Sequence, residues 1–278
     1  MTAASLPQEI DPYLRDWALV PDGPLITTRS SWVLPVLCQS EPATLKVARI
    51  PDEHAGYQLM SWWNGQGAAK TIAASNGALL LERATGPRSL AHMARSGRDD
   101  EACRILCRTA EQLHVRRSEP LPELYRLDIW FQPLFDLSPS HPVLAPAAEQ
   151  ARRLLADQRD IRPLHGDLHH DNVLDFGERG WLAIDPHGLV GERIFDFANI
   201  FTNPDLADPT QQVATLPGRF EARLGIVTEE TGIETVRLLE WIVAWTGLSA
   251  AWFIGDGDHA GAEIDLQVYA LAQQLRGR

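Results

Sequence analysis

The sequence has few cysteines, no basic tract and no apolar run long enough to span a bilayer, and each shortage excludes a class of protein. The 278 residues include 3 cysteines, Cys38, Cys103 and Cys107, which do not make a disulfide framework and fit a reducing cytoplasm. The longest apolar stretch, 241–255, has 15 residues, whereas a membrane span needs about 20. We therefore expect no membrane segment there but a buried core helix, broken at Gly247.

The chain also lacks a basic balance and a secretory leader. Its first ten residues, MTAASLPQEI, contain neither a positive start nor an apolar core. The net charge is −12, with 6 basic and 8 acidic residues in 1–84 and 19 basic and 29 acidic residues in the remainder. A nucleic-acid groove is not expected, whereas an acidic field favours a cationic small-molecule ligand. Nothing in the pattern indicates an oligomeric state.

What the chain does have is a polar loop of unusual composition, HGDLHHDN at 165–172, followed by Asp185 at the end of the apolar run WLAI. Asp167 can accept a proton from, or orient, an attacking hydroxyl, and Asn172 and Asp185 offer the oxygen ligands that Mg²⁺ prefers. Strands at 173–176 and 181–184, joined by Gly177-Glu178-Arg179-Gly180, form a predicted hairpin that brings Asp185 back beside Asn172. This order of residues indicates a phosphoryl-transfer site.

A different chemistry is open to the same loop. His165, Asp167, His169 and His170 could bind a transition metal in a hydrolase, since imidazole and carboxylate suit such ions. A solvated polar turn is the plainest alternative. The motif by itself does not decide between these readings.

Four segments give the chain a family resemblance: HGDLHHDN at 165–172, RGWLAIDPHGLVGE at 179–192, WWNGQGA at 62–68 and LSAAW at 248–252. From about Ile26 to Ala272 the chain resembles the aminoglycoside phosphotransferases, within them the streptomycin 6-phosphotransferase and hydroxyurea kinase branch. The resemblance implies an α+β, bilobal, protein-kinase-like fold. A small antiparallel sheet with one helix precedes a larger helical lobe, and ATP lies between them.

The resemblance also implies roles for residues of the first lobe. Lys46, in the strand-like run ATLKVARI, is expected to hold the nucleotide phosphates, and Glu53, in the first turn of a helix from Pro51-Asp52 to about Trp63, to orient it. Glu82 and Ala84 occupy the hinge, where their main chain meets adenine. The phosphate loop has no glycine, so the hydroxyls and amides of Ser30 and Ser31 are expected to replace it, unless the pair is a plain turn.

Two departures from protein kinases favour a small acceptor. Asp185 is followed by Pro186, and a helix is expected to start by Phe195, which leaves no room for a long activation segment. Gly166 stands where protein kinases carry arginine. The chain is therefore not expected to phosphorylate proteins.

The expected organisation is a nucleotide-binding lobe at 1–84 and a helical catalytic and substrate-binding lobe at 85–278. We expect a turn at Glu41-Pro42 and a hairpin turn at Asn76-Gly77. Strands are expected at 25–28, 32–38, 44–50, 68–73 and 78–82. Helical periodicity predicts helices around 102–113, 124–134, 144–154, 195–201, 211–224, 231–251 and 260–275.

Acidic residues and tryptophans gather near the C-terminus. Between 228 and 270 the only Lys or Arg is Arg237, against eight acids: Glu229, Glu230, Glu234, Glu240, Asp256, Asp258, Glu263 and Asp265. Carboxylates and tryptophan faces bind guanidinium groups, which streptomycin carries. Trp241, Trp245 and Trp252 are expected mainly in the core, and Asp256 and Asp258 in contact with substrate.

The sequence thus predicts an ATP- and Mg²⁺-dependent kinase of a small hydroxyl-bearing molecule, foremost an aminoglycoside of the streptomycin type. A kinase of hydroxyurea or another metabolite is the first alternative, and the metallohydrolase is the second.

Overall fold

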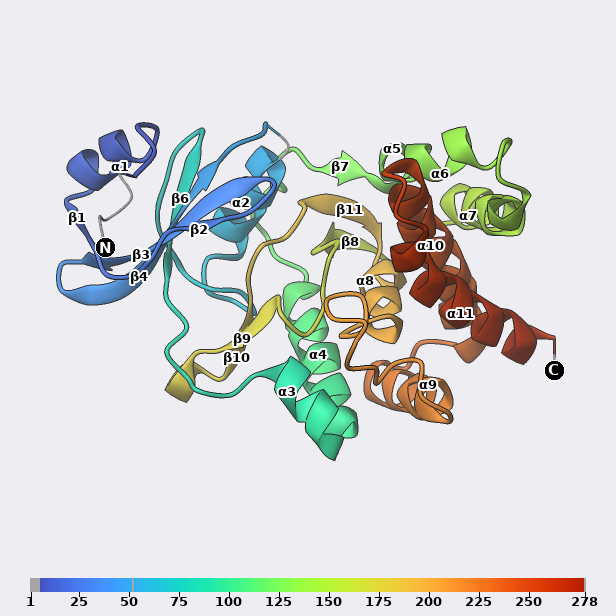
Figure 1. Cartoon of the computed structure of the whole chain (residues 1–278). Helices are drawn as coiled ribbons and strands as arrows, with labels where there is room; N and C mark the ends of the chain where they lie inside the picture. Colours follow the sequence, from blue (N-terminus) through green and yellow to red (C-terminus); the bar gives the residue numbers. More distant parts are fainter. Residues whose placement is uncertain (1–5, 52, 278) are drawn as a thin grey trace.

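The N-terminal part of the protein is an antiparallel sheet and the C-terminal part is mainly helical (Figure 1). The structure, a computed structural model, describes residues 6–51 and 53–277. The predicted helix start at Pro51-Asp52 falls partly outside them, since Asp52 is not described. The expected lobe division near residue 84 falls between the last strand of the large sheet and the first helix that follows it.

The large sheet has the order β1-β3-β4-β6-β5, with β2 paired to the opposite end of β3. The expected hairpin at Asn76-Gly77 is present between β5 and β6, but the turn before β4 lies at Gln39-Ser40 and not at Glu41-Pro42. Both turn residues have positive φ, the geometry of a two-residue hairpin that matches strand twist, so β4 begins at once with Glu41. The strands span Leu19–Pro21 (β1), Ile26–Thr27 (β2), Ser31–Cys38 (β3), Glu41–Ala48 (β4), Thr71–Ala74 (β5) and Ala78–Glu82 (β6).

Strand β6 shows how this sheet separates two cores. Its side chains alternate between the two faces, as strand geometry requires. Ala78 and Leu80 join the small core that contains Ile10, next to helix α1 (Asp11–Asp16), whereas Leu79 and Leu81 join the large core that contains Trp63 of helix α2 (Glu53–Trp63). The sheet is therefore buried on both sides, and α2 connects it to the helical part.

The helical part agrees with most of the predicted periodicity. Two helices begin later than predicted: the one expected from Gln211 begins at Arg219, and the one expected from Thr231 begins at Thr235, after the first of these has ended at Thr231. The carboxylate of Asp205 accepts the backbone N–H groups of Val213, Ala214 and Thr215 and thereby holds the segment before Arg219 as a turn. The helices are α3 (Leu90–Met93), α4 (Asp99–Leu113), α5 (Leu127–Trp130), α6 (Gln132–Leu137), α7 (Ala145–Ala156), α8 (Ile194–Ala198), α9 (Arg219–Thr231), α10 (Thr235–Gly255) and α11 (His259–Arg276).

Helix α10 is the centre of this part and packs against α6, α7, α8 and α11. In the described chain it is the one helix long and apolar enough to cross a bilayer, but 72% of its apolar window is buried inside the protein, as expected for a core helix. The expected break at Gly247 is wrong, because α10 continues through it. A Cβ at Gly247 would lie 2.2 Å from the Cβ of Ala147, so the glycine serves the close approach of α10 to α7.

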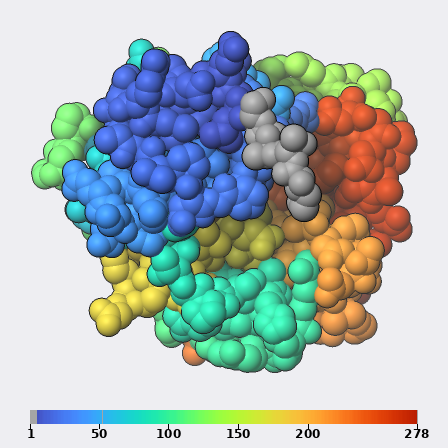
Figure 2. Space-filling view, turned by 60° about the vertical axis from the view of Figure 1, so that its left-hand side comes forward, coloured from blue at the N-terminus to red at the C-terminus, as the bar shows by residue number. Residues whose placement is uncertain are grey.

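Two small sheets carry the polar loop and Asp185. Strand β8 (Ile161–Leu164) pairs with β11 (Leu189–Glu192), which also pairs with β7 (Tyr125–Arg126). The predicted hairpin is present as β9 (Val173–Asp175) and β10 (Trp181–Ala183). HGDLHHDN lies between β8 and β9, and Asp185 follows β10. In Figure 2 the olive-coloured part of the chain, whose colour lies between those of residues 150 and 200 on the bar, is recessed beneath the blue N-terminal part.

Candidate active site

The Asp167 carboxylate has side-chain partners from three other residues, and it still faces a cavity. Asn199 donates to its Oδ1 at 2.8 Å, Asn172 donates to its Oδ2 at 3.1 Å, and Nε2 of His169 lies 3.4 Å from Oδ2. Its side chain remains 37% exposed and lines a cavity of about 430 Å³. A hydroxyl in this cavity can therefore reach a carboxylate whose direction is already fixed.

The charge of Asp167 follows from these neighbours. Burial by itself raises a carboxyl pKa, but the nearby His169 and His187 rings and the Asn199 amide together hold the pKa of Asp167 well below its usual range. Asp167 is thus ionised at physiological pH. A carboxylate of such low basicity orients a hydroxyl and takes its proton late, which suits a loose phosphoryl-transfer transition state.

The main chain of the loop is fixed by Asp196 of α8, a residue that the sequence did not single out. Its carboxylate accepts the N–H groups of His165 (2.9 Å) and Gly166 (2.8 Å) and lies 2.8 Å from Nε2 of His114. Gly166 has φ +84°, and a Cβ there would lie 2.7 Å from Leu189. The backbone conformation and the lack of space for a side chain therefore require glycine at position 166.

His165 connects the loop to the segment between β10 and Asp185. Its Nδ1 accepts the N–H of Asp167, so the ring proton is on Nε2, which donates to the carbonyl of Ile184 at 2.7 Å. The ring is fully buried, and this burial lowers its pKa. His165 braces the loop and has no access to a substrate.

The hairpin brings Asp185 to Asn172, as predicted. The N–H of Ile184 donates to the carbonyl of Asn172 at 2.9 Å, so the following residue, Asp185, emerges next to it. The amide nitrogen of Asn172 faces Asp167, which leaves its Oδ1 available as a ligand. Asp185 adopts φ +62°, an uncommon conformation that aspartate tolerates. This donor set of carboxylate and amide oxygens fits Mg²⁺.

Lys46 and Glu53 form the expected pair. The Lys46 ammonium lies 2.5 Å from Glu53 and also contacts Asp185. The side chains of Lys46 and Glu53 are 9% and 13% exposed, whereas that of Asp185 is 47% exposed. The Lys46–Glu53 pair is therefore largely buried. The Asp185 side chain is accessible from a cavity, and a metal cation there could replace the Lys46 ammonium beside it.

Helix α2 rests directly on the segment after Asp185. A Cβ at Gly56 would lie 2.0 Å from the carbonyl oxygen of Pro186, and one at Gly188 would lie 2.4 Å from the backbone of Ala55. Two glycines therefore allow the helix that carries Glu53 to touch the chain that carries Asp185. The positions of the two carboxylates around Lys46 are coupled by this contact.

A second cavity, of about 250 Å³, has the character of a nucleotide site. Lys46 and Asp185 line it together with apolar side chains from both parts of the protein, as a flat base requires. Its lining is Ile26, Val33, Pro35, Thr44, Lys46, Leu81, Glu82, Arg83, Ala84, Leu174, Phe176, Ile184 and Asp185.

Glu82 and Ala84 lie at the expected edge of this cavity. The Glu82 side chain accepts the N–H of Lys70 and pairs with Arg179, while its own N–H donates to the carbonyl of Lys70. The N–H of Ala84 has no hydrogen-bond acceptor within the described chain. It is thus Ala84, rather than Glu82, whose main-chain donor remains available to a base.

Ser30 and Ser31 form the plain turn that the sequence left open. The N–H of Thr28 donates to the carbonyl of Ser31 at 2.9 Å and closes the turn. The Ser31 hydroxyl is buried and lies 3.5 Å from the Tyr57 hydroxyl. The Ser30 carbonyl accepts the N–H of Arg49. Neither residue lines the nucleotide cavity. A phosphate contact by these serines stays a prediction, and the Ser31 N–H already donates to Oγ1 of Thr28 at 2.9 Å.

The cavity that Asp167 lines has an aromatic wall. Trp245 and Trp252 line this cavity. Trp241 and Trp245 are buried in the core, as expected, so Trp245 belongs both to the core and to the cavity wall. Asp256 is at the rim, 3.1 Å from the Arg29 guanidinium. The full lining is Arg29, Asp167, His169, Asn199, Asn203, Leu206, Ala207, Trp245, Ser249, Trp252, Phe253 and Asp256.

Asp258 is placed differently. Its carboxylate accepts the N–H of Gly261 at 2.9 Å and so caps the start of α11, and it is outside the lining of this cavity. The expected substrate contact of Asp258 therefore receives no support from the geometry.

The histidines do not form a metal cluster. Within residues 6–51 and 53–277, no three His, Cys, Asp or Glu side chains come together as metal ligands. His165 is engaged by backbone groups, and His170 is buried, where burial and the nearby Arg223 lower its pKa. The metallohydrolase alternative is not supported.

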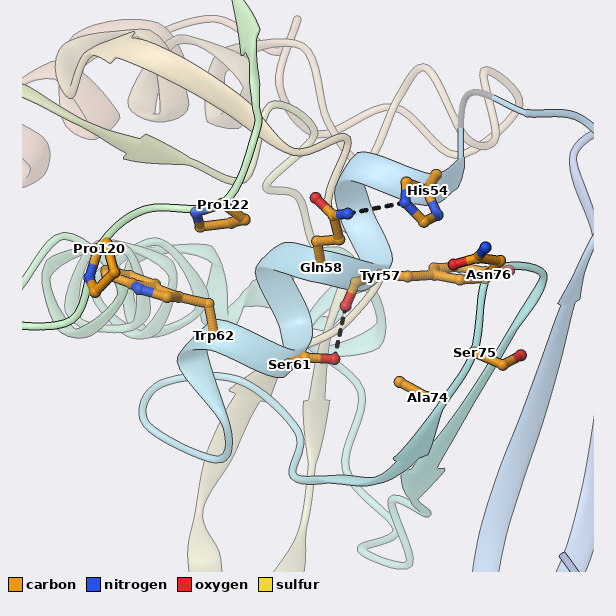
Figure 3. Close-up of a pocket in the computed structure, with 10 residues that line it drawn as sticks. All are labelled: His54, Tyr57, Gln58, Ser61, Trp62, Ala74, Ser75, Asn76, Pro120 and Pro122. Atoms are coloured by element: carbon orange, nitrogen blue, oxygen red, sulfur yellow. Dashed lines mark hydrogen bonds between the residues drawn. The ribbon is translucent and has the colours of Figure 1, made fainter.

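A further cavity, of about 500 Å³, lies on the outer face of α2 (Figure 3). Trp62, Pro120 and Pro122 form its apolar part, and the paired His54 and Gln58 its polar part. It shares no residue with the predicted site.

Comparison with known proteins agrees with this arrangement. Residues 16–257 match the family described as "Aminoglycoside/hydroxyurea antibiotic resistance kinase". A streptomycin 3''-kinase of Klebsiella pneumoniae is 66% identical over 93% of this chain and 98% of its own. A streptomycin 6-kinase of Streptomyces glaucescens is 30% identical over 99% and 90%.

Solved structures are similar in fold. Aminoglycoside phosphotransferase APH(4)-Ia, in a ternary complex with ADP and hygromycin B, has a TM-score of 0.67 at 12% identity, covering 95% of this chain and 97% of its own. A choline/ethanolamine kinase family protein from Mesorhizobium loti has a TM-score of 0.66 at 13% identity, covering 98% and 96%. These similarities confirm the expected α+β, bilobal, protein-kinase-like fold.

Proposed function

The chain belongs to the aminoglycoside/hydroxyurea antibiotic resistance kinases, and from this premise we propose that it transfers the γ-phosphoryl group of ATP to a hydroxyl group of streptomycin. As a member of this family it is a phosphotransferase that acts on a small molecule. The relative at 66% identity, a streptomycin 3''-kinase, supports the choice of acceptor. The cytoplasm, where ATP is available, is the proposed location.

Asp167 is the group that orients the acceptor hydroxyl and receives its proton. Lys46, held by Glu53, binds the nucleotide phosphates, and Asn172 and Asp185 would hold Mg²⁺. The ion, when bound, would neutralise charge that develops on the phosphates. The Lys46 ammonium contacts Asp185 and lines the same cavity, where it would meet the phosphates.

The nucleotide base lies in the apolar cavity between the sheet and β9. Leu174, Phe176 and Ile184 cover one face, and the N–H of Ala84 is the donor to its edge. Of the serine pair, Ser30 is the one proposed to contact the phosphates, because the Ser31 N–H donates to Thr28 and its hydroxyl is buried beside Tyr57. In this proposal residues 1–84 bind the nucleotide and 85–278 supply the catalytic loop and the acceptor cavity.

The acceptor is cationic, and two features of the cavity favour it. Asp256 offers a carboxylate at the rim, and the Trp245 and Trp252 rings offer faces that attract guanidinium groups. Hydroxyurea, the acceptor named for a relative at 28% identity, is neutral and small, so it uses neither feature.

One observation carries the proposal: Asp167 lines one cavity, Lys46 and Asp185 line the other, and the Asn172–Ile184 hydrogen bond joins the two positions. An acceptor hydroxyl and a terminal phosphate can therefore meet between them.

The test is an ATP-consumption screen over streptomycin, other aminoglycosides and hydroxyurea, with the phosphorylated position of the product located by NMR. We expect turnover with streptomycin that stops with EDTA and returns with excess Mg²⁺. Consumption of ATP with hydroxyurea but not with any aminoglycoside would replace the proposed acceptor. Turnover that persists in EDTA would refute the metal site.

A further inference from the structure

Two buried amides connect the Asp167 carboxylate to another part of the wall of its cavity. Asn203 donates from Nδ2 to Oδ1 of Asn199 at 2.8 Å, and Asn199 donates from Nδ2 to Oδ1 of Asp167 at 2.8 Å. Asn203 and Asn199 are 4% and 1% exposed, and all three residues line the cavity proposed for the acceptor. The group that orients the acceptor hydroxyl is therefore the end of a chain of hydrogen bonds that begins elsewhere in the same cavity.

The direction of each amide follows from the charge at one end of this chain. The ionised Asp167 carboxylate can only accept hydrogen bonds, so Asn199 turns its NH₂ group toward Asp167 and its side-chain oxygen away. That oxygen and the main-chain oxygen of Asn199 both accept from Nδ2 of Asn203, at 2.8 and 3.3 Å. A reversed Asn203 amide would set oxygen against oxygen. The side-chain oxygen of Asn203, Oδ1, is thereby fixed as an acceptor.

This oxygen is the unused end of the chain. Within residues 6–51 and 53–277 no group donates to Asn203 Oδ1, yet the oxygen is not enclosed by protein atoms, so it opens to the cavity that Asn203 lines. The main chain of Asn203 is held at the same time by Arg223, whose buried guanidinium donates to the Asn203 carbonyl at 2.7 Å. A fixed acceptor in a cavity calls for a donor from the ligand.

We propose that Asn203 binds an N–H or O–H donor of the acceptor through Oδ1 and, through Asn199, sets the direction of the Asp167 carboxylate. A donor on Oδ1 polarises the Asn203 amide and strengthens the two hydrogen bonds behind it, because such chains are cooperative. Only two amides separate this oxygen from Asp167, so the donor belongs to the part of the acceptor next to the reacting hydroxyl. Asn203 is both a substrate contact and a positioning residue. The inference rests on the proposed function, since it requires an acceptor bound in this cavity.

Two substitutions separate these two roles. Asn203→Asp keeps acceptor oxygens in a side chain of the same size but cannot donate to Asn199 as a carboxylate, whereas Asn203→Leu removes both donor and acceptor. We expect the single-turnover rate of streptomycin phosphorylation to fall at least about threefold in both variants. The KM for streptomycin should rise about tenfold in Asn203→Leu and stay the same or fall in Asn203→Asp. Gln212→Glu, the same exchange of amide for acid at an exposed position, should match the wild type.

A double-mutant cycle with Asn199→Ala tests whether Asn203 acts on the rate through Asn199. In the Asn199→Ala background, Asn203→Leu should not lower the single-turnover rate further but should still raise the KM for streptomycin. Affinity for a non-hydrolysable ATP analogue, measured by calorimetry, should equal that of the wild type in every variant. Thermal unfolding checks that each variant is folded at the assay temperature, and Asn203→Asp completes the cycle if Asn203→Leu does not fold.

Three results would overturn the inference. The first is a wild-type rate and a wild-type KM in both Asn203 variants. The second is an equal loss of rate, acceptor affinity and nucleotide affinity, which marks a purely structural role. The third is a further fall in rate when the Asn203 substitution is added to Asn199→Ala.

The same assays distinguish this inference from the proposed function. A wild-type protein that phosphorylates no acceptor refutes both together. If the wild type phosphorylates an aminoglycoside other than streptomycin, only the proposed acceptor fails, and the Asn203 variants are compared with that compound. Turnover of streptomycin by the wild type, with no effect of either Asn203 substitution, refutes this inference alone.

Discussion

In the loop at 165–172 Asp167 is held by side chains from three positions, and Asp196 holds the main chain of His165 and Gly166, whereas at the rim of the cavity Asp256 is held by one arginine. The Arg29 and Asp256 side chains are 88% and 61% exposed. Exposed pairs of this kind contribute about 0–1 kcal/mol, while removal of one partner from a buried network costs about 3–5 kcal/mol.

This difference separates two tasks. In the proposed function the loop presents one Asp167 oxygen in one direction to every acceptor, which agrees with neighbours that fix Asp167 from several sides. The rim must admit an acceptor, so its contact is exchangeable. Substitutions in the loop should therefore change the rate of chemistry, and those at the rim should change acceptor affinity.

The largest effect is expected for Asp167→Asn. Loss of the carboxylate removes the proton acceptor and should lower kcat by about 10²- to 10⁴-fold. Affinity for an ATP analogue should stay near that of wild type, because the nucleotide cavity does not include Asp167. Steady-state kinetics with streptomycin and calorimetry with the analogue measure both quantities. Asp171→Asn, an exposed acid in the same loop, is the matched control. Wild-type kcat in Asp167→Asn would remove the loop from the chemistry.

Lys46→Met should have the next largest effect. It removes the charge aimed at the phosphates, so kcat should fall by about 10²-fold and the KM for ATP should rise. Lys70→Met, an exposed lysine just before β5, is the control and should be neutral. An unchanged KM for ATP in Lys46→Met would show that the nucleotide binds elsewhere.

Gly56→Ala tests the coupling of α2 to Asp185. The new methyl group would meet the carbonyl of Pro186, so stability should fall by about 1–3 kcal/mol in denaturant unfolding, and kcat should fall with it. Gly225→Ala lies in helix α9 with open space around it and should be neutral or stabilising by up to about 1 kcal/mol. Equal stability of the two variants would refute the contact.

The smallest effects belong to the rim. Arg29→Ala should lower the KM for streptomycin about 2- to 5-fold because it releases Asp256, and Asp256→Asn should raise it by a similar factor. Asp258→Ala should leave this KM unchanged and cost about 1 kcal/mol of stability through the lost cap. If the KM for streptomycin rose in Asp258→Ala and not in Asp256→Asn, Asp258 would be the substrate contact and Asp256 would have no role.

The sequence predicted the parts of the site that depend on local order. Asp167, Asn172 and Asp185 lie in one loop and one hairpin, and the hairpin geometry follows from two apolar runs and a glycine-rich turn. Strand β6 and helix α2 were predicted within a few residues for the same reason. Lys46 and Glu53 were predicted through the family resemblance, because the contact of Lys46 with Asp185 joins residues 139 positions apart.

The residues that were missed act over longer separations or through packing. Asp196 lies in the short helix α8 and Asn199 directly after it, 30 and 32 residues from Gly166 and Asp167, which they bind, and nothing in Phe195-Asp196-Phe197 distinguishes a brace from a surface acid. The turn that displaces the start of α9 depends on one side chain, Asp205. Gly247 predicted a break because its close neighbour, Ala147, is about 100 residues away.

The most direct measurement of the central account is Mn²⁺ binding in the presence of a non-hydrolysable ATP analogue, followed by electron paramagnetic resonance. The account predicts a nucleotide-dependent Mn²⁺ site in the wild type that is retained in Asp167→Asn and weakened at least about tenfold in Asp185→Ala. Equal Mn²⁺ binding by Asp185→Ala and the wild type would contradict it.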